Sequence, residues 1–247
     1  MAEHGDTRHR LGWGSVSKLL TAYATLIAAE EGALDLDEPA GPRGSTVRHL
    51  LAHASGLSWD GPKPIGKPGE RRIYSNTGYL ALADHLERRA EMPFGDYIAE
   101  AVLEPLDLDA TLEGDAAGGI VGTLGAMLAF GQEALAPTLI APETLAEATS
   151  VQFPGLEGVL PGFGRQTPND WGLGFELRDG KSPHWTGSRN SARTYGHFGS
   201  KPGTATFLWI DPERRLVAAA VADTSFGEWA AAAWPALSDA LLEEVEQ

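Results

Sequence analysis

The sequence contains no cysteine. Disulfide bridges, thiolate nucleophiles, iron–sulfur clusters and cysteine zinc sites are therefore excluded. The lack of disulfides is compatible with a reducing compartment. The first ten residues, MAEHGDTRHR, also contain no apolar stretch of the kind that a signal peptide needs. We therefore expect a cytoplasmic protein.

Positive charge is scarce, because 19 Lys and Arg residues stand against 34 Asp and Glu residues, a net charge of −15. An acidic surface repels phosphate backbones, so we expect no nucleic-acid partner. Long apolar runs are also missing: the longest, residues 120–130 and 229–237, fall short of the ~18 residues that span a bilayer. We expect no membrane insertion, whereas a small-molecule substrate is compatible with this charge, because local charges govern a pocket.

The periodicity of apolar residues changes along the chain. Helical spacing predicts helices first, strand-like alternation follows after residue 170, and helical spacing returns at the end. The expected helices cover residues 16–31, 46–53 after a Ser45 cap, 77–90, 93–103, about 126–149 and 229–245. The expected strands cover residues 172–177, 194–198, 204–210 and 216–222. Helices followed by strands predict the α+β class with an antiparallel sheet.

Several common functional motifs are absent. The sequence has no G-x-S-x-G nucleophile elbow and no phosphate-binding G-x-x-x-x-G-K-[ST] loop. His49 and His53 are spaced for one helix face in HLLAH, and such a pair can bind zinc. The glutamate of H-E-x-x-H and a third ligand are missing, however, so a structural role for His53 at the helix end is favoured over a metal site. We expect no cofactor.

The segment Ser15-Val-Ser-Lys18 places a serine and a lysine one turn apart at the start of a helix. A serine hydroxyl becomes a strong nucleophile when a neighbouring base takes its proton. Lys18 can act as that base if burial and the helix N-terminus keep it neutral. The Ser15 N–H, in the first turn, is free to bind an oxyanion. The pair alone is common, and an exposed serine and lysine explain it equally well.

Two further segments have matching chemistry. In Tyr74-Ser75-Asn76, Tyr74 could relay a proton and Asn76 could bind both Lys18 and a substrate carbonyl. In His197-Phe198-Gly199-Ser200, Gly199 lets a ligand approach the backbone, and the Ser200 N–H could be a second oxyanion donor. Taken singly, a helix cap with a core tyrosine and a buried core histidine are the simpler interpretations.

Together, the three segments occur in the order and context of a known family. The chain resembles class C β-lactamases, the related D-alanyl-D-alanine carboxypeptidases and family VIII esterases, whose superfamily carries an S-x-x-K, S-D-N and K-T-G set. The resemblance extends over nearly the whole chain, including TVRHLLAHASGL at 46–57, LEPLDLDAT at 103–111, WGLGFEL at 171–177 and residues 196–223.

This resemblance implies a β-lactamase/transpeptidase-like α+β fold, an antiparallel sheet flanked by helices with an adjoining, mostly helical lobe. It implies one domain over 1–247, with the helical lobe at about 56–150 and the sheet lobe at about 1–55 plus 171–247. It further implies a serine hydrolase that acts through an acyl-enzyme on an ester, amide or β-lactam carbonyl. Ser15, Lys18 and Tyr74 would be catalytic. The substrate-binding and oxyanion residues would be Asn76, His197, Gly199 and Ser200.

The chain departs from this family at two places. Only 14 residues precede Ser15, where the family has strands that pair with the C-terminal strands, so we expect an open sheet edge and a possible homodimer through it. His197 and Phe198 also replace the cation and the hydroxyl residue that grip a substrate carboxylate, although Lys201 or Arg193 could compensate. We therefore expect uncharged short-chain esters to be hydrolysed better than penicillins. This difference in hydrolysis should narrow near pH 6, as His197 gains a proton.

A second interpretation is a catalytically impaired binding or scaffold protein with the same fold. The shortened start and the altered third motif favour it. The intact trio of Ser15, Lys18 and Tyr74 favours an enzyme, because a scaffold does not need it.

Overall fold

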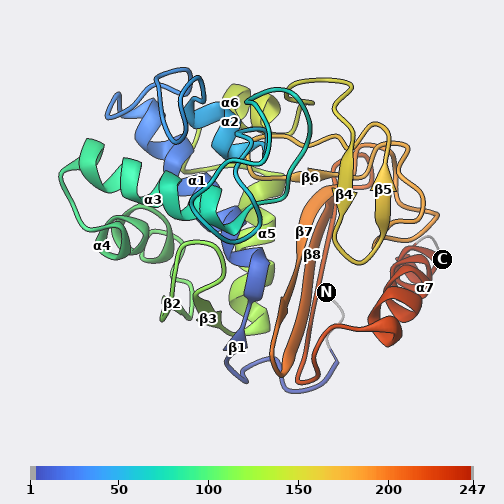
Figure 1. Cartoon of the computed structure of the whole chain (residues 1–247). Helices are drawn as coiled ribbons and strands as arrows, with labels where there is room; N and C mark the ends of the chain where they lie inside the picture. Colours follow the sequence, from blue (N-terminus) through green and yellow to red (C-terminus); the bar gives the residue numbers. More distant parts are fainter. Residues whose placement is uncertain (1–3, 246–247) are drawn as a thin grey trace.

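Strands from the C-terminal third form the main sheet of this α+β protein (Figure 1). A computed structural model describes residues 4–245. The sheet has the order β6-β7-β8-β9 and is antiparallel throughout. Its strands are β6 (Glu176–Leu177), β7 (Tyr195–Lys201), β8 (Thr204–Asp211) and β9 (Leu216–Ala222). The α+β class and the antiparallel sheet expected from the sequence are confirmed.

Helices cover both faces of this sheet. Helix α5 (Leu124–Leu135) packs on one face of β8 and β9, and α7 (Glu228–Val245) lies on the other (Figure 1). Trp234 of α7 packs edge-on against Phe207 of β8, and the Trp209 indole donates a hydrogen bond to Ser238 of α7. Alternation along β8 thus sends apolar side chains to both helix layers, which explains why all eight of its residues are buried.

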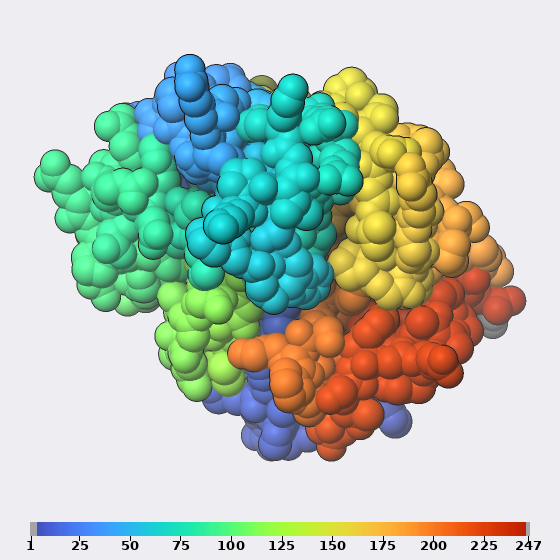
Figure 2. Space-filling view, viewed as in Figure 1, coloured from blue at the N-terminus to red at the C-terminus, as the bar shows by residue number. Residues whose placement is uncertain are grey.

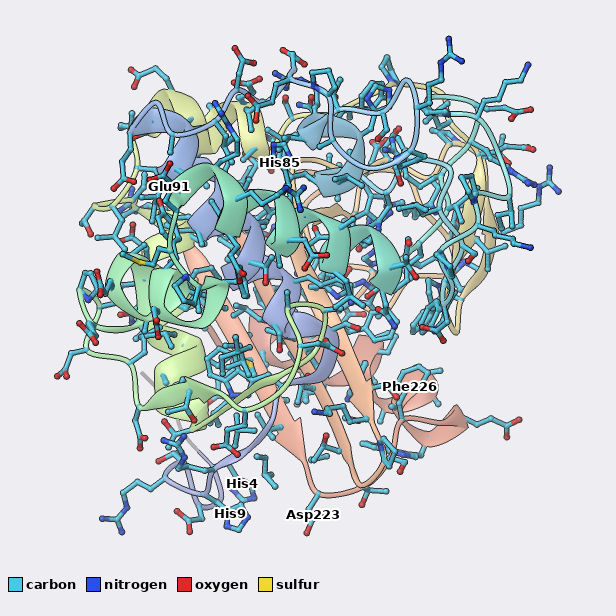
Figure 3. The ribbon with its side chains drawn as sticks, turned by 60° about the vertical axis from the view of Figure 1, so that its left-hand side comes forward. His4, His9, His85, Glu91, Asp223 and Phe226 are labelled. Carbon is cyan, nitrogen blue, oxygen red and sulfur yellow. The ribbon has the colours of Figure 1, made fainter. Side chains whose placement is uncertain are left out.

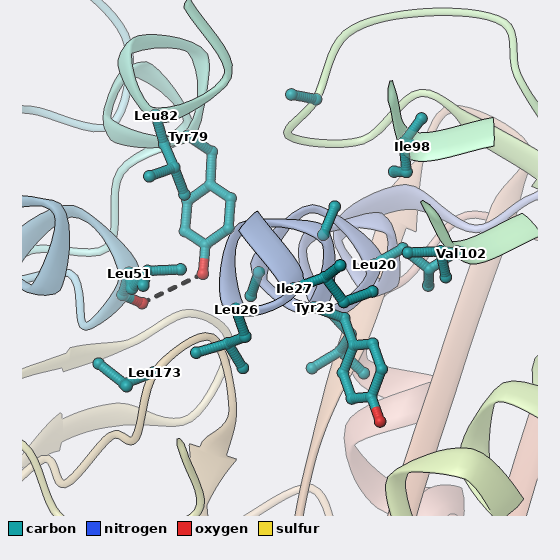
Figure 4. Packing of buried hydrophobic residues seen from close by; sticks show 14 of the residues in the cluster. Leu20, Tyr23, Leu26, Ile27, Leu51, Tyr79, Leu82, Ile98, Val102 and Leu173 are labelled. Atoms are coloured by element: carbon teal, nitrogen blue, oxygen red, sulfur yellow. Dashed lines mark hydrogen bonds between the residues drawn. The ribbon is translucent and has the colours of Figure 1, made fainter. Parts of the chain in front are cut away.

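Helix α1 (Ser17–Glu30) runs through the centre of the molecule, directly after the short 3₁₀ turn η1 (Gly14–Val16). All its residues from Ser17 to Ala28 are buried, including Leu20, Tyr23 and Leu26 (Figure 4). Because its side chains are buried on every side, the helix is surrounded by protein. Its N-terminus, where Ser15 lies, is therefore held rigidly.

The remaining helices lie around α1. They are α2 (Val47–Leu51), α3 (Asn76–Ala90), α4 (Phe94–Ile98), which continues into the π-helical turn η2 (Ala99–Leu103), and α6 (Pro142–Ala148). The cap of α2 is Thr46, whose hydroxyl accepts from the His49 N–H, so the expected Ser45 cap is wrong by one residue. Ser75 caps α3 in the same way, accepting from the Gly78 N–H.

Two small sheets were not anticipated. One joins β1 (Leu11–Gly12), β3 (Ile120–Gly122) and β2 (Ala110–Leu112) in that spatial order. The other is a hairpin of β4 (Gly158–Leu160) and β5 (Gly164–Gln166). Because these strands are two or three residues long and rich in glycine, they carry no measurable alternation of apolar residues.

Strand β9 forms the outer edge of the main sheet: within residues 4–245 its only strand partner is β8. The N-terminal strand β1 pairs with β3 instead. Within the same residues, no helix is both long and apolar enough to cross a bilayer.

Candidate active site

Ser15 lies in η1, immediately before α1. Gly14 precedes it with φ +53°, a left-handed conformation that favours glycine. A Cβ atom at Gly14 would lie 2.8 Å from the backbone nitrogen of Ser200, so η1 is pressed against the end of β7. The backbones of Gly14 and Ser200 are therefore in close contact, and only a glycine at position 14 permits this contact.

Lys18 is completely buried below Ser15. Its Nζ atom lies 3.2 Å from Ser15 Oγ, 2.8 Å from Asn76 Oδ1 and 2.6 Å from the Ala117 carbonyl oxygen. A neutral amine has two N–H groups and one lone pair. Because the Asn76 and Ala117 oxygens can only accept, they take the two N–H groups. The third position of Nζ faces Ser15 Oγ: the ammonium form donates a hydrogen bond there, and the neutral form has its lone pair there for the proton of Ser15.

The electrostatic surroundings favour this neutral form of Lys18. Burial lowers the pKa of Lys18 from 10.5 to about 7, and the negative charges of Asp115 and Asp60 oppose that shift. A substantial fraction of the lysine is therefore uncharged near neutral pH, which a general base requires.

Tyr74 enters the site from the segment before α3, and its ring is buried. The Lys18 Nζ atom lies 5.0 Å from the centre of this ring. Burial raises the pKa of the Tyr74 phenol above its usual range, and a hydrogen bond with the Ser15 hydroxyl partly opposes that shift. Tyr74 is thus a protonated phenol at neutral pH, beside both Ser15 and Lys18.

His197 is buried beside Tyr74, in the wall of the site. Its Nδ1 lies 2.6 Å from the Phe198 carbonyl oxygen, which can only accept, so Nδ1 carries the proton. Its Nε2 therefore accepts from the Tyr74 hydroxyl at 3.4 Å. Burial, followed by the nearby charge of Lys18, lowers the pKa of His197 to about 3. The expectation that His197 gains a proton near pH 6 is therefore wrong.

Gly199 and Ser200 form the wall opposite η1. A Cβ atom at Gly199 would lie 2.1 Å from the Trp13 carbonyl oxygen and 3.0 Å from the Ser15 nitrogen. Ser200 pairs with Ala205, next to the pair that closes the hairpin. Because bonded and non-bonded pairs alternate in an antiparallel ladder, the Ser200 N–H points away from β8, towards η1. It can therefore bind an oxyanion together with the Ser15 N–H.

These residues surround a cavity of about 440 Å³. Figure 2 shows the molecular surface hollowed where the cyan, green-yellow, yellow and orange parts of the chain meet. Of the residues expected from the sequence, Ser15, Tyr74, Asn76, His197 and Ser200 line the cavity. Lys18 lies beneath Ser15, and Gly199 contacts η1 from behind.

The sequence did not reveal most of the other lining residues. The loop 114–119 supplies the Ala117 carbonyl to Lys18 and the Gly118 carbonyl to Lys201. An apolar wall comes from separate elements and comprises Trp59, Leu160, Pro161, Trp171, Phe198 and Phe226. Figure 3 shows Phe226 on the segment that connects β9 to α7. Of these wall residues, the sequence pointed only to Phe198, through the third motif, and to Trp171, through the family resemblance at 171–177.

Glu176 is a buried carboxylate in the same wall. It accepts from the Trp185 indole and from Nε2 of His184, each at 2.8 Å, and it pairs with Lys181. Burial alone would raise the pKa of Glu176, but His184 and Lys181 lower it to about 2. The carboxylate is fully occupied by these partners, so it holds the wall in place and is not available as a base.

The two histidines of HLLAH do not share a helix face. Helix α2 ends at Leu51, and His53 has φ +54°. His49 packs on Phe153, whereas His53 packs on Tyr74. Among residues 4–245, no group of three His, Asp or Glu side chains is placed to hold a metal ion.

Comparisons with known proteins show the family and the fold of the chain. The family model described as Beta-lactamase matches residues 3–112 and 109–242. A crystal structure of a β-lactamase from Mycobacterium bovis is 48% identical, with a TM-score of 0.95, over 99% of this chain and 90% of that one. The D-amino acid amidase of Ochrobactrum anthropi is 18% identical over 98% of this chain and 85% of its own, with a TM-score of 0.78. At this identity the similarity shows a shared fold and nothing more.

A curated relative, penicillin-binding protein 4* of Bacillus subtilis, is 30% identical over 130 residues. The match covers 39% of this chain and 29% of the relative, so this chain corresponds to less than a third of that protein's length.

Proposed function

Because the chain belongs to the β-lactamase family, we propose that it is a serine hydrolase that forms an acyl-enzyme on Ser15. The observation that carries the proposal is the environment of Lys18. Two acceptors, Asn76 Oδ1 and the Ala117 carbonyl oxygen, lie beside Nζ, and Ser15 Oγ lies 3.2 Å away at its third position, where the neutral amine carries its lone pair. A pKa of about 7 allows this amine to accept a proton at neutral pH.

The proposed reaction begins when Lys18 takes the Ser15 proton and Oγ attacks the substrate carbonyl. The N–H groups of Ser15 and Ser200 stabilise the resulting oxyanion. The protonated Lys18 returns the proton to the leaving group by way of the Tyr74 phenol, which lies between Ser15 and His197. Water then attacks the acyl-enzyme as Lys18 accepts one of its protons, and Lys18 returns that proton to Ser15 Oγ when the carboxylic acid leaves.

We further propose that the preferred substrates are uncharged carboxylic esters with a small or apolar acyl group. Charge-assisted hydrogen bonds contribute roughly 1.5–3 kcal/mol each, and they are how an anionic substrate would be held. Neutral His197 offers no cation, and Phe198 packs among Phe163, Trp185 and Trp234. Lys201 is the remaining cation on β7 and lines the cavity, and one of its three N–H groups donates to the Gly118 carbonyl.

A substrate screen tests the proposal directly. The panel contains p-nitrophenyl esters, D-amino-acid amides and nitrocefin, each compared between the wild type and Ser15→Ala. Intact-mass spectrometry after treatment with a fluorophosphonate should show one adduct in the wild type and none in Ser15→Ala. Ser150→Ala is the matched control, because this serine is exposed, lies outside the cavity, and its hydroxyl bonds only to Glu147 and Gln152. Turnover or labelling that survives in Ser15→Ala would contradict the proposal, as would an inert wild type.

A further inference from the structure

One residue outside the cavity holds the chain on both sides of Tyr74. The His53 carbonyl oxygen accepts from the Ile73 N–H at 2.9 Å, and Nδ1 of the His53 ring accepts from the Ser75 N–H at 3.1 Å. The left-handed backbone of His53, with φ +54°, turns both acceptors towards the same segment. Both chain neighbours of Tyr74 are therefore bonded to His53.

The ring of His53 also packs on Tyr74. The ring centres lie 4.4 Å apart with an interplanar angle of 35°. On another side, the His53 ring meets Trp171 at 4.6 Å and 89°, an edge-to-face contact. His53 is almost completely buried and does not line the cavity. It thus contacts two cavity residues without being able to touch a substrate.

The protonation state of His53 follows from its partners. Because Nδ1 accepts a backbone N–H, the ring proton must be on Nε2. Burial, followed by the charge of Lys18, lowers the pKa of His53 well below 6.5, so the ring stays neutral. A charged ring would have to give up its acceptor for Ser75 and would face Lys18. His53 therefore cannot serve as a proton donor or acceptor in the reaction.

We propose that His53 is a positioning residue that fixes the Tyr74 phenol between Ser15 and His197, an inference that rests on the proposed function. His53 holds the main chain and one face of the ring, while His197 holds the hydroxyl. A misplacement of about 1 Å can cost a hundredfold in rate, so a loose Tyr74 would impair proton return to the leaving group. Position 53 therefore needs three features: a left-handed backbone conformation, a hydrogen-bond acceptor at the place of Nδ1, and a flat ring.

Two variants separate these three features. Asn adopts the left-handed conformation readily and places Oδ1 close to the position of Nδ1, but it lacks the ring. Gly adopts the conformation and lacks both. We expect His53→Gly to reduce kcat by about a hundredfold with little change in KM. His53→Asn should lose about tenfold or less, because the Ser75 N–H keeps its acceptor.

Chemical rescue distinguishes positioning from simple space filling. Imidazole fits the space left by His53→Gly and has an acceptor nitrogen, whereas pyrrole has the same shape and an N–H but no acceptor. Imidazole should restore much of kcat in a saturable way, and pyrrole should not. The double variant Ser15→Ala/His53→Gly gives the rate of hydrolysis by imidazole itself, and this rate is subtracted. Equal rescue by both rings, rescue by neither, or an unimpaired His53→Gly overturns the inference.

A measurement on the wild type decides the matter if His53→Gly does not fold. In ¹⁵N NMR, His53 should remain the neutral Nε2–H tautomer from about pH 5.5 to about pH 8.5. An Nδ1–H tautomer or an imidazolium in that range overturns the inference, because the bond from Ser75 would then be absent. A wild type without Ser15-dependent turnover instead contradicts the proposed function and leaves the NMR result to judge the placement of His53.

Discussion

The Nζ atom of Lys18 lies 3.2 Å from Oγ of Ser15, at the bottom of the cavity and out of contact with solvent. Removing Lys18 from water makes its charged form costly, and this lowers its pKa to about 7. Burial is thus what allows an ordinary lysine to act as a base at neutral pH. The activity of the protein should therefore depend on pH through the protonation of Lys18 beside Ser15.

The acylation rate should rise with pH through about 7, because only the uncharged Lys18 accepts the Ser15 proton. Asp115→Asn should move this midpoint to lower pH, since the Asp115 charge raises the pKa of Lys18. The asparagine keeps the oxygen that accepts from the Ala117 N–H. Asp107→Asn is the charge-matched control, because Asp107 is exposed and outside the cavity. A midpoint that moves upwards in Asp115→Asn would rule out Lys18 as the base.

Gly199→Ala should reduce kcat by about a hundredfold or more, the usual cost of losing an oxyanion donor. The added methyl group would lie 2.1 Å from the Trp13 carbonyl oxygen, so β7 and η1 must separate and the two N–H groups with them. Gly180→Ala is the control, because its methyl group would meet no atom within 4 Å. Steady-state kinetics with circular dichroism checks this. Full activity in a folded Gly199→Ala would exclude the oxyanion site.

Short p-nitrophenyl esters should have a higher kcat/KM than penicillins, by on the order of tenfold to a hundredfold. Lowering the pH to about 6 should not narrow this gap, because His197 stays neutral down to its pKa of about 3. The ratio of the two kcat/KM values, measured across pH, is the readout, since a shared loss of base cancels in it. A ratio that favours penicillins would contradict the proposed preference for uncharged esters. A ratio that shifts in favour of penicillins at acidic pH would contradict a neutral His197.

Strand β9 should allow two chains to pair, because its outer backbone groups have no strand partner within residues 4–245. Sedimentation should then show a dimer that forms as the protein concentration rises. Ala219→Pro should abolish it, because ladder alternation turns the Ala219 N–H away from β8 and a proline there removes an outward donor only. Leu237→Ala is the control, because this exposed side chain lies on α7, away from the strand edge. A wild type that remains monomeric at every concentration would disprove the pairing.

The sequence by itself determined the elements that carry long, regular patterns. Residues 16–31 predicted the central helix, and the structure has η1 and α1 over Gly14–Glu30. Residues 216–222 predicted β9 with the same bounds. The strand expected at 172–177 is largely absent: only Glu176 and Leu177 pair, because the glycines at 172 and 174 lie against Ala148 and Ala22. Close packing there depends on distant residues, which periodicity does not detect.

The sequence also determined which reactive side chains are present, since the order of Ser15, Lys18, Tyr74 and Asn76 can be read directly from it. Only the tertiary structure decided their chemical states. Lys18 can be a neutral amine and His197 is not a cation because both are buried, and burial depends on segments such as loop 114–119 and Trp171 that lie far away in sequence. The cost of placing a charge in a low-dielectric interior is set by everything that surrounds it, so it has no local signature in the chain.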